Sequence, residues 1–276
     1  NITGRDRLMS WLPFYHDMGL VGFVLTPVAA QISVDYLDTR EFAMRPRQWL
    51  KMMTQSKATI AFAPSFGYDL CARRVRPGDI AEYDLSHWRV AGIGAEMIRP
   101  QTLDHFADIL EPAGFDRRAF VACYGMAECT LGVSFSPLSQ GFSTHYIDSD
   151  HLADQHEAVL MDTGETEGRG RHFVNCGVPL PSFEVEVRDE DGNALPDWKS
   201  GVIHLRGPSV MSGYFNLPEE TAHALCGDGW LNTGDIGYLA HGVLTITGRK
   251  KDLIIIHGRN IWPQDLEHLA ETQPEV

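Results

Sequence analysis

An apolar run ends in a tyrosine, a glycine and a carboxylate at residues 120–128. Phe-Val-Ala-Cys is followed by Tyr124-Gly125-Met126-Ala127-Glu128. The face of a tyrosine can stack on a nucleotide base, and a carboxylate four residues later can hold Mg²⁺ near phosphates. A core tyrosine followed by a solvated glutamate fits the same residues equally well. Alone, the segment leaves a nucleotide site and an ordinary strand end open.

A glycine-rich turn precedes this segment. Gly92-Ile93-Gly94-Ala95-Glu96 follows the strand-like residues 88–91 and comes before a helix that opens near Pro100. A glycine turn at the end of a strand lets backbone amides approach a ligand closely, as happens at the switch points of α/β sheets. An ordinary tight turn has the same composition, so this signal is weak by itself.

Two further polar turns lie near the end of the chain. Asp235 stands in the Gly-flanked turn of residues 229–237, and a carboxylate there is suited to accept both hydroxyls of a ribose. In Gly248-Arg249-Lys250-Lys251-Asp252 the cations could meet a ribose-phosphate. A turn-forming aspartate and a solvated charge run are the structural alternatives.

The elements that must position these turns are of two kinds. Residues 8–70 alternate short apolar runs with helical patterns such as 47–53, which predicts a layered, mostly parallel α/β sheet. From about residue 180 the pattern predicts strands and turns, at 183–187, 202–205, 244–247 and 253–256, and thus a β-rich subdomain.

Residues 139–172 have weak periodicity and many polar residues, which indicates a long surface segment or insertion. Pro263 opens a helix expected to run through Glu271.

Composition narrows the possible functions. The 276 residues are 43% hydrophobic and carry a formal net charge of −14, which argues for a globular protein and against nucleic acid as a partner. The five cysteines include no C-x-x-C pair, so they signal neither a disulfide framework nor a zinc site, and a reducing cytoplasm fits them best. The most apolar stretch, 18–34, carries Pro27 and is short for a transmembrane segment. A buried helix and strand are expected there.

The order and spacing of these motifs resemble the adenylate-forming superfamily of acyl-CoA synthetases, luciferases, peptide-synthetase adenylation domains and fatty acyl-AMP ligases. The resemblance covers essentially the whole chain. Residues 11–20, with His16, look like the family's aromatic-His segment, and Tyr124–Glu128 is similar to its Tyr-Gly-x-Thr-Glu motif. The glycine segments of 200–215, then 233–235, then 248–263 follow in family order.

The resemblance implies ATP-dependent activation of a carboxylic acid, with the acyl-adenylate and pyrophosphate as products. His16 would face the acid, Glu128 would bind Mg²⁺, and Lys251 would be the hinge of a C-terminal domain that swings between two half-reactions. Tyr124 would stack near the adenine, Ile246 would pack on it, and Asp235 and Arg249 would hold the ribose. The implied nucleotide-binding set is Gly94, Ala95, Glu96, Tyr124, Gly125, Met126, Ala127, Asp235, Ile246 and Arg249.

Two features of the sequence resemble those of the fatty acyl-AMP ligase branch. Ala127 stands where most relatives carry a phosphate-contacting threonine. The span from Glu128 to Asn175 is long enough to hold the insertion that this branch carries. That insertion is longer than most loops. In that branch a fatty acid passes to the phosphopantetheine arm of an acyl carrier protein. An ordinary acidic surface loop would explain the length of this span equally well, without transfer to a carrier protein. An acyl-CoA synthetase and a catalytically inactive remnant that binds nucleotide or a partner also stay open.

The chain departs from the family pattern at both ends. No Ser/Thr/Gly-rich phosphate loop precedes residue 8, and the C-terminal catalytic lysine of the family is not reached. We therefore expect a fragment of a longer enzyme, inactive or weak alone. The expected organisation is an α/β subdomain at 1–178, a β-rich subdomain at 179–250, and a hinge with the start of a small α+β C-terminal domain at 251–276.

Overall fold

The structure is a computed structural model that describes residues 2–162, 170–252, 254–256, 259–261, 266 and 270. The chain forms two compact units, Asn1–Ser143 and Thr144–Val276. The sequence places the first boundary at 178, whereas the first compact unit ends at Ser143. Most of the helix expected from Pro263 to Glu271 lies outside the described residues, as does much of the segment 251–276.

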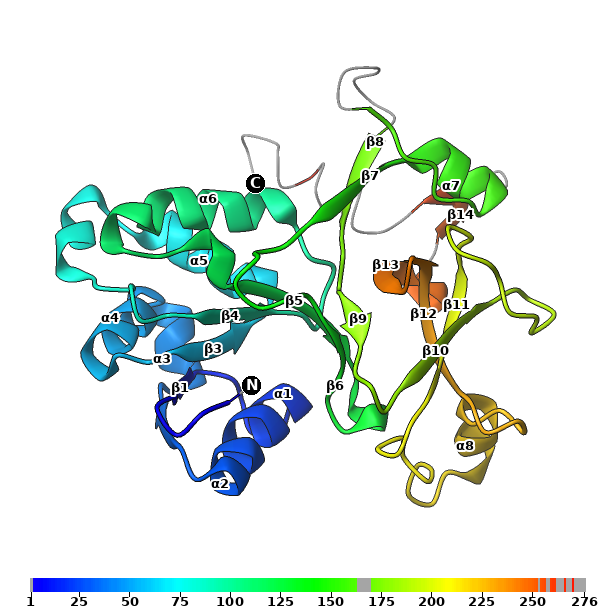
Figure 1. Ribbon diagram of the computed structural model, residues 1–276, viewed down its shortest axis with the longest axis horizontal. Helices are drawn as coiled ribbons and strands as arrows, with labels where there is room; N and C mark the ends of the chain where they lie inside the picture. Colours follow the sequence, from blue (N-terminus) through cyan, green and yellow to red (C-terminus); the bar gives the residue numbers. More distant parts are fainter. Residues whose placement is uncertain are drawn as a thin grey trace. The chain divides into compact units, whose positions relative to one another are not determined.

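Unit 1 is built on a mainly parallel sheet in the order β2-β1-β3-β4-β5-β6 (Figure 1). The first five strands run parallel, and β6 returns antiparallel to β5. This confirms the predicted α/β class. The apolar runs at 59–62 and 120–123 lie almost wholly in strands, whereas only the first half of the run at 9–12 belongs to one. The strands are β1 (Arg7–Ser10), β2 (Ser33–Tyr36), β3 (Ile60–Ala63), β4 (Val90–Ile93), β5 (Phe120–Gly125) and β6 (Gly132–Phe135).

Helices connect the parallel strands, and α5 and α6 lie side by side along the sheet (Figure 1). In α4 the apolar residues Trp49, Leu50 and Met53 recur at helical spacing and are buried, so this face packs on the core. The helices of unit 1 are α1 (Asp17–Leu20), α2 (Thr26–Ala30), α3 (Thr39–Met44), α4 (Arg47–Ser56), α5 (Ser65–Arg74) and α6 (Pro100–Leu110). Short 3₁₀ turns are η2 (Pro77–Glu82), η3 (Glu111–Ala113), η4 (Arg117–Ala119) and η5 (Ala127–Cys129).

A π-helical turn, η1 (Val21–Leu25), joins α1 to α2. Thr26 closes this turn with two hydrogen bonds to the Val21 carbonyl, one from its amide and one from its hydroxyl at 2.7 Å. The Tyr36 hydroxyl donates to the Phe23 carbonyl over 2.5 Å, which attaches the turn to β2. The apolar stretch 18–34 therefore forms helix and strand as expected, but the expected burial is wrong for most of it: only Met18, Gly19, Phe23 and Pro27 are buried.

Aromatic side chains fill the core of unit 1. The rings of Trp49 and Trp88 lie 5.1 Å apart edge to face, and Tyr68 meets Phe106 and Phe120 in the same geometry at 5.1 and 5.6 Å. All five rings are fully or almost fully buried. Edge-to-face pairs add to the stabilisation that comes from burying apolar area, so this cluster holds α4, α5 and α6 on the sheet.

Unit 2 is made of antiparallel strands. Its main sheet has the order β10-β11-β12-β13, and the unit also contains two separate strand pairs, β7–β8 and β14–β15. The predicted β-rich character is confirmed. The strands are β7 (Thr144–Asp148), β8 (Gly170–Val174), β9 (Val178–Pro179), β10 (Glu184–Arg188), β11 (Gly201–Arg206), β12 (Leu231–Ala240), β13 (Val243–Arg249), β14 (Ile254–Ile256) and β15 (Arg259–Ile261). The helical elements are α7 (Ser149–Gln155), α8 (Pro218–Ala224) and the 3₁₀ turn η6 (Lys250–Asp252).

The expected surface segment at 139–172 contains regular structure. It supplies β7 and α7 and the start of β8, with residues 163–169 outside the described part. Asp148 caps α7 by accepting hydrogen bonds from the amides of Asp150 and His151, both at 3.0 Å. The ring of His145 on β7 lies 3.0 Å from the Tyr238 hydroxyl on β12, which fastens β7 to the main sheet.

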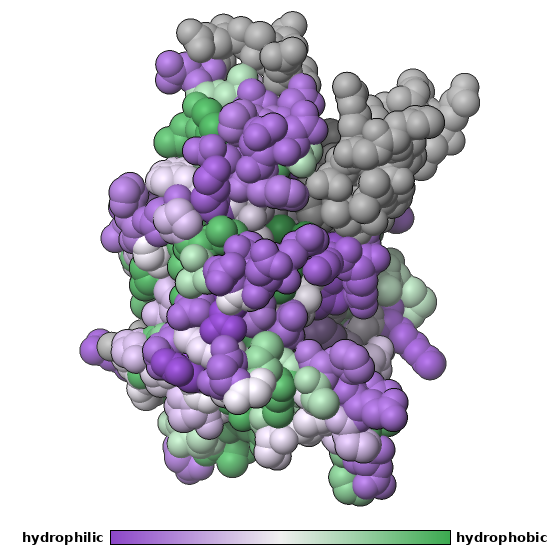
Figure 2. All heavy atoms as spheres, turned by 90° about the vertical axis from the view of Figure 1, so that its right-hand side faces the viewer, coloured by the Kyte–Doolittle hydropathy of each residue, from purple (hydrophilic) through white to green (hydrophobic). Residues whose placement is uncertain are grey.

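The surface of Figure 2 is mainly hydrophilic, with smaller hydrophobic areas between the polar residues. This agrees with the acidic composition of the chain. Within the part of the chain that the structure describes, no helix is long and apolar enough to cross a bilayer.

Candidate nucleotide-binding site

The two glycine turns of unit 1 leave the sheet side by side. β4 and β5 are parallel neighbours, and Ile93 at the end of β4 is the register partner of Ala122. Because parallel strands end at the same edge of a sheet, the turns of 94–96 and 126–128 emerge from that edge together. Ligands of open α/β sheets bind outside the carboxyl ends of the strands.

The turn after β4 is closely fitted to β5. A Cβ added to Gly94 would lie 2.8 Å from Cys123 Sγ and 2.9 Å from the Cys123 carbonyl oxygen, so only glycine fits there. Ala95 has φ +69°, in the left-handed region that non-glycine residues rarely enter. Glu96 accepts a hydrogen bond from the Phe66 amide at 2.9 Å. The turn therefore has one defined conformation, with Ala95 exposed at its tip.

The turn after β5 carries the predicted aromatic and carboxylate. Tyr124 is buried and faces Ser134 in the β5–β6 ladder. A Cβ on Gly125 would collide with the Leu131 carbonyl oxygen, which also accepts the Met126 amide hydrogen at 2.8 Å. This closure leads into η5, where Ala127 is exposed and Glu128 is half-buried.

Thr130 ends this turn in an unusual conformation that the sequence does not signal. Its φ is +73°, which is rare for a β-branched residue. Its amide donates to the Ala127 carbonyl at 2.9 Å, so the turn bearing Glu128 is closed by a strained residue. Strain of this kind concentrates at functional sites.

His16 follows β1, whose carboxyl end lies at the same edge of the sheet as those of β3, β4 and β5. It caps α1, where its Nδ1 accepts the Met18 amide hydrogen at 3.2 Å, and its side chain is about half exposed. A Cβ on Gly22, in the π turn beyond His16, would lie 3.5 Å from Leu131 Cδ2. The helical segment that begins after His16 therefore contacts a residue that closely follows the Glu128 turn.

Asp235 and Arg249 form a second cluster, in unit 2. They are register partners across β12 and β13, and Arg249 Nε donates to Asp235 Oδ1 at 2.7 Å. Asp235 is 4% exposed. Its amide donates to Thr233 Oγ1 at 3.1 Å, and the preceding Gly234 has φ +70°. The carboxylate is thus held by a guanidinium and by a tight turn.

Ile246 and Lys251 lie further along the same strand and turn. Ile246 is half-buried and opposite Gly237, just past an irregularity of the ladder between Ile236 and Gly237. Gly237 has no room for a Cβ, which would collide with the Thr245 carbonyl oxygen. Lys251 is exposed in η6.

The resemblance implies that Glu128 binds Mg²⁺, so we compared its surroundings with the ways in which proteins hold this ion. Among residues 2–162, 170–252 and the short described stretches beyond, no group of three or more His, Cys, Asp and Glu side chains could hold a metal ion. Mg²⁺ is commonly bound by one or two carboxylates together with substrate phosphates and water, rather than by a cage of protein ligands. The partly exposed carboxylate of Glu128 fits that mode of binding.

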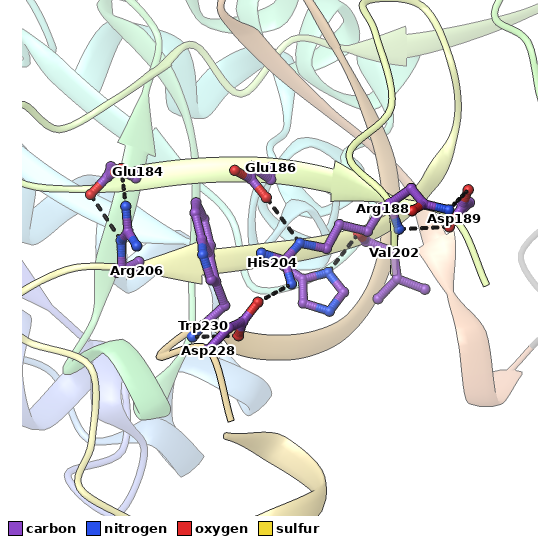
Figure 3. A network of polar contacts seen from close by, with 10 residues as sticks. Glu184, Glu186, Arg188, Asp189, Val202, His204, Arg206, Asp228 and Trp230 are labelled. Atoms are coloured by element: carbon purple, nitrogen blue, oxygen red, sulfur yellow. Dashed lines mark hydrogen bonds and ion pairs between the residues drawn. The ribbon is translucent and has the colours of Figure 1, made fainter. Parts of the chain in front are cut away.

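A charged network on β10 and β11 was not foreseen (Figure 3). Trp230 packs against the guanidinium groups of Arg188 and Arg206, which lie 4.9 and 4.7 Å from its ring centre. Arg188 also donates to Glu186 at 2.9 Å and to Asp228 at 2.7 Å. Charged residues at every second position from 184 to 188 are the sequence signal for it. The network contains none of the expected site residues, and it stabilises the sheet edge.

Comparison with known proteins identifies the family of the chain. Residues 1–215 match the model of the family described as AMP-binding enzyme. The chain is 51% identical over 272 residues to a putative acyl-CoA synthetase of Caulobacter vibrioides, covering 99% of the chain and 47% of that protein. It is 36% identical to a medium-chain-fatty-acid–[acyl-carrier-protein] ligase of Moorena producens, covering 98% and 47%. The chain therefore spans about half the length of these relatives.

Solved structures give the same result. One from a study of fatty acyl-adenylate ligases of E. coli and L. pneumophila superposes with a TM-score of 0.94 at 51% identity, over 99% of this chain and 49% of that one. A fatty acyl-adenylate ligase of L. pneumophila in complex with acyl adenylate and pyrophosphate superposes with a TM-score of 0.87 at 37% identity, over 99% and 49%. The family model matches residues 1–215, which is more than half of the chain. We conclude that this chain belongs to the AMP-binding enzyme family.

Proposed function

We propose that this chain forms the nucleotide-binding part of an enzyme that activates a fatty acid with ATP. The carboxylate oxygen of the acid attacks the α-phosphorus, the bond from that phosphorus to the bridging oxygen breaks, and pyrophosphate leaves. The observation that carries the proposal is the pair of turns at the carboxyl edge of β4 and β5, one with an exposed tip at Ala95 and one with Glu128. Similarity to a ligase solved with acyl adenylate and pyrophosphate supports it.

The two turns of unit 1 have separate tasks in this proposal. The segment from Gly94 to Glu96 and Tyr124 border the adenine, and the backbone of Gly125, Met126 and Ala127 borders the phosphates. Glu128 binds Mg²⁺, which would neutralise charge on the phosphate oxygens. Most of the rate enhancement then comes from positioning and from charge stabilisation. His16 faces the acid.

The cluster of unit 2 recognises the sugar. Asp235 accepts hydrogen bonds from the ribose hydroxyls. Arg249 fixes the orientation of that carboxylate through its 2.7 Å bond. Ile246 packs on the base. Lys251 is the hinge after which the remainder of the protein changes orientation between the two half-reactions.

We further propose that the acyl group passes to an acyl carrier protein. Two relatives named as medium-chain-fatty-acid–[acyl-carrier-protein] ligases, at 36% and 34% identity, support this acceptor. Ala127 in place of a threonine supports it too. The competing candidate is an acyl-CoA synthetase, which is favoured by the name of the Caulobacter relative at 51% identity.

One assay separates these candidates. The complete enzyme is incubated with a fatty acid, ATP, Mg²⁺ and either CoA or a holo carrier protein, and acyl-adenylate, acyl-CoA and acyl carrier protein are quantified. Acylated carrier protein with little acyl-CoA is the expected result. Efficient acyl-CoA formation would reject the carrier protein as acceptor, and the absence of acyl-adenylate with every acid would reject the activation step itself. A panel of acids of graded length, scored by pyrophosphate release, identifies the chain length.

A further inference from the structure

The first turn of α5 reaches the glycine turn after β4. The Phe66 amide, at the second position of this helix, donates to Glu96 Oε1 at 2.9 Å. The first amides of a helix have no partner within the helix, and they carry its positive dipole end. A side-chain oxygen can accept the hydrogen of such an amide. The Glu96 side chain thus has a task at the helix, although its neighbours border the proposed adenine site.

A second bond from the same helix holds the strand that leads into this turn. The Tyr68 hydroxyl donates to the Gly92 carbonyl at 2.9 Å, and Tyr68 is fully buried. Between the two bonds lie Gly94, which is pressed against Cys123, and Ala95 in its left-handed conformation. A conformation that is unfavourable for alanine persists only when its surroundings enforce it. The bonds to Tyr68 and Phe66 supply that enforcement at both ends of the turn.

The same helical turn also contacts the segment that carries His16. A Cβ on Gly67 would lie 2.7 Å from Trp11 Cζ2, and the Phe66 ring meets the Trp11 ring edge to face at 5.8 Å. Trp11 directly follows β1 and starts the 11–16 segment. The start of α5 therefore contacts both the turn proposed for the adenine and the segment proposed for the acid.

We propose that Glu96 is a positioning residue: it holds the Gly94–Ala95 turn in its nucleotide-binding shape by capping α5, and Tyr68 assists from the other end. This rests on the proposed function, and it changes the task of Glu96 from contact with the nucleotide to support of its neighbours. The bond needs an acceptor oxygen at the end of a side chain of this length. It does not need a negative charge.

The test compares Glu96→Ala with Glu96→Gln in the complete enzyme. Glutamine keeps an acceptor oxygen at the same reach, whereas alanine leaves the Phe66 amide without this partner. We expect Glu96→Ala to raise KM for ATP about fivefold with little change in kcat, the range expected when one hydrogen bond is lost. Glu96→Gln should stay within about twofold of the wild type. Equal loss in both variants would show that the charge itself acts on the nucleotide or on Mg²⁺ and would overturn the proposal.

A tyrosine pair provides a matched control. Tyr68→Phe removes the hydroxyl that holds Gly92, and we expect it to raise KM for ATP about threefold. Tyr83 is also buried in unit 1, but its hydroxyl has no hydrogen-bond partner among the described residues. Tyr83→Phe should therefore leave KM for ATP unchanged. If Tyr68→Phe behaves as Tyr83→Phe does, the support from α5 is refuted.

Hydrogen exchange separates this inference from the proposed function. In the nucleotide-free enzyme, the peptide that contains the Phe66 amide should exchange faster in Glu96→Ala than in the wild type or in Glu96→Gln. This result does not depend on which reaction the enzyme performs, so an enzyme without adenylation activity still reports on the cap. Unchanged exchange in Glu96→Ala would show that the bond is not formed in solution and would overturn the inference even if adenylation is observed.

Discussion

Arg249 donates its Nε hydrogen to Asp235 Oδ1 over 2.7 Å, and the two residues face each other in register across β12 and β13. Asp235 is almost fully buried, whereas the Arg249 side chain is about half exposed. The guanidinium thus compensates a carboxylate that has lost most of its water, and it fixes the direction of the carboxylate oxygens. A ribose would meet an acceptor that is already oriented.

Asp235→Asn should weaken ATP binding about tenfold in the complete enzyme, because the amide cannot accept two hydroxyl hydrogens as a carboxylate does. The same change removes the negative charge that faces Arg249, at a cost of about 1–2 kcal/mol in the free energy of unfolding after allowance for solvent screening. Binding of ATP and of 2′-deoxy-ATP is measured by calorimetry. The wild type should prefer ATP, and the variant should lose that preference.

An exposed ion pair on the same unit is the control for Asp235→Asn. Arg206 donates to Glu184 on the β10–β11 ladder, and both side chains are largely exposed. Glu184→Gln should change neither ATP binding nor the preference for the 2′-hydroxyl, and because the pair is exposed to solvent it contributes little to stability. An Asp235→Asn variant that still discriminates 2′-deoxy-ATP would contradict the ribose assignment.

Glu128→Gln should abolish Mg²⁺-dependent adenylation while the protein still folds. The side chain belongs to η5 at the protein surface and glutamine has nearly the same volume, so packing is preserved and only the charge is lost. Pyrophosphate release is titrated with Mg²⁺, and thermal unfolding reports on the fold. We expect a loss of about 100-fold or more in kcat/KM, in the range that removal of electrostatic stabilisation gives. Turnover near that of the wild type would rule out Glu128 as the metal ligand.

Asp6 should make the stability of the enzyme sensitive to acid. Arg89 donates to both of its oxygens at 2.7 Å, and the Thr3 amide and the Thr59 hydroxyl donate as well. These bonds, above all those from Arg89, hold the pKa of Asp6 well below its usual value of 3.8. Because the folded pKa is lowered, this stabilisation is complete at pH values well above the usual pKa of 3.8 and is lost as the pH falls through and below it.

Asp6→Asn tests that sensitivity. We expect it to lower the free energy of unfolding by about 2 kcal/mol at pH 7, because the charged bonds between a buried carboxylate and Arg89 are lost. Denaturant titrations at about pH 7 and about pH 3 measure the difference between variant and wild type. The difference should shrink at the lower pH, and a difference that is equal at both would disprove the linkage.

His145 should add a second dependence on pH, at milder acidity. Burial between β7 and the main sheet lowers its pKa below the ordinary 6.5, and His241 lowers it further. The unfolded chain therefore binds a proton at this position before the folded chain does, and stability falls as the pH drops through about 6.5. His145→Gln keeps a polar partner for the Tyr238 hydroxyl and removes the titration.

Unfolding of wild type and His145→Gln is compared at about pH 8 and about pH 5.5, on either side of the ordinary histidine pKa. The wild type should lose more stability than the variant over this interval. Parallel losses in the two proteins would mean that other groups account for the whole pH dependence.

Local patterns were sufficient to predict much of the fold. Apolar runs and glycine turns indicated β4, β5 and the position of Glu128, because these elements follow from residues adjacent in the chain. The partner of Glu96 was not predictable, because Phe66 lies 30 residues away and meets it only after α5 packs on the sheet. The pairing of Asp235 with Arg249 depends on a register that shifts at Gly237, and no spacing rule reveals it.

The segment 139–172 shows a different limit. Its helix is short and largely exposed, so it leaves little apolar periodicity. Asp148 followed by Ser149 and Asp150 is nevertheless a cap signal that could have located α7. The strands β7 and β8 are stabilised by pairing with each other, and that pairing is not encoded in either strand alone.

The π turn of Val21–Leu25 has a consequence for how this family can diversify. Such a turn holds one residue more than an α-helical turn would, and each residue turns a helix by about 100°. Deletion of a single residue there would restore a regular helix. The residues beyond Leu25 would then rotate about the helix axis relative to His16, and the face that Gly22 now presents to Leu131 would change. A lineage could therefore exchange the side chains on the side proposed to face the acid through one insertion or deletion, with no substitution at all.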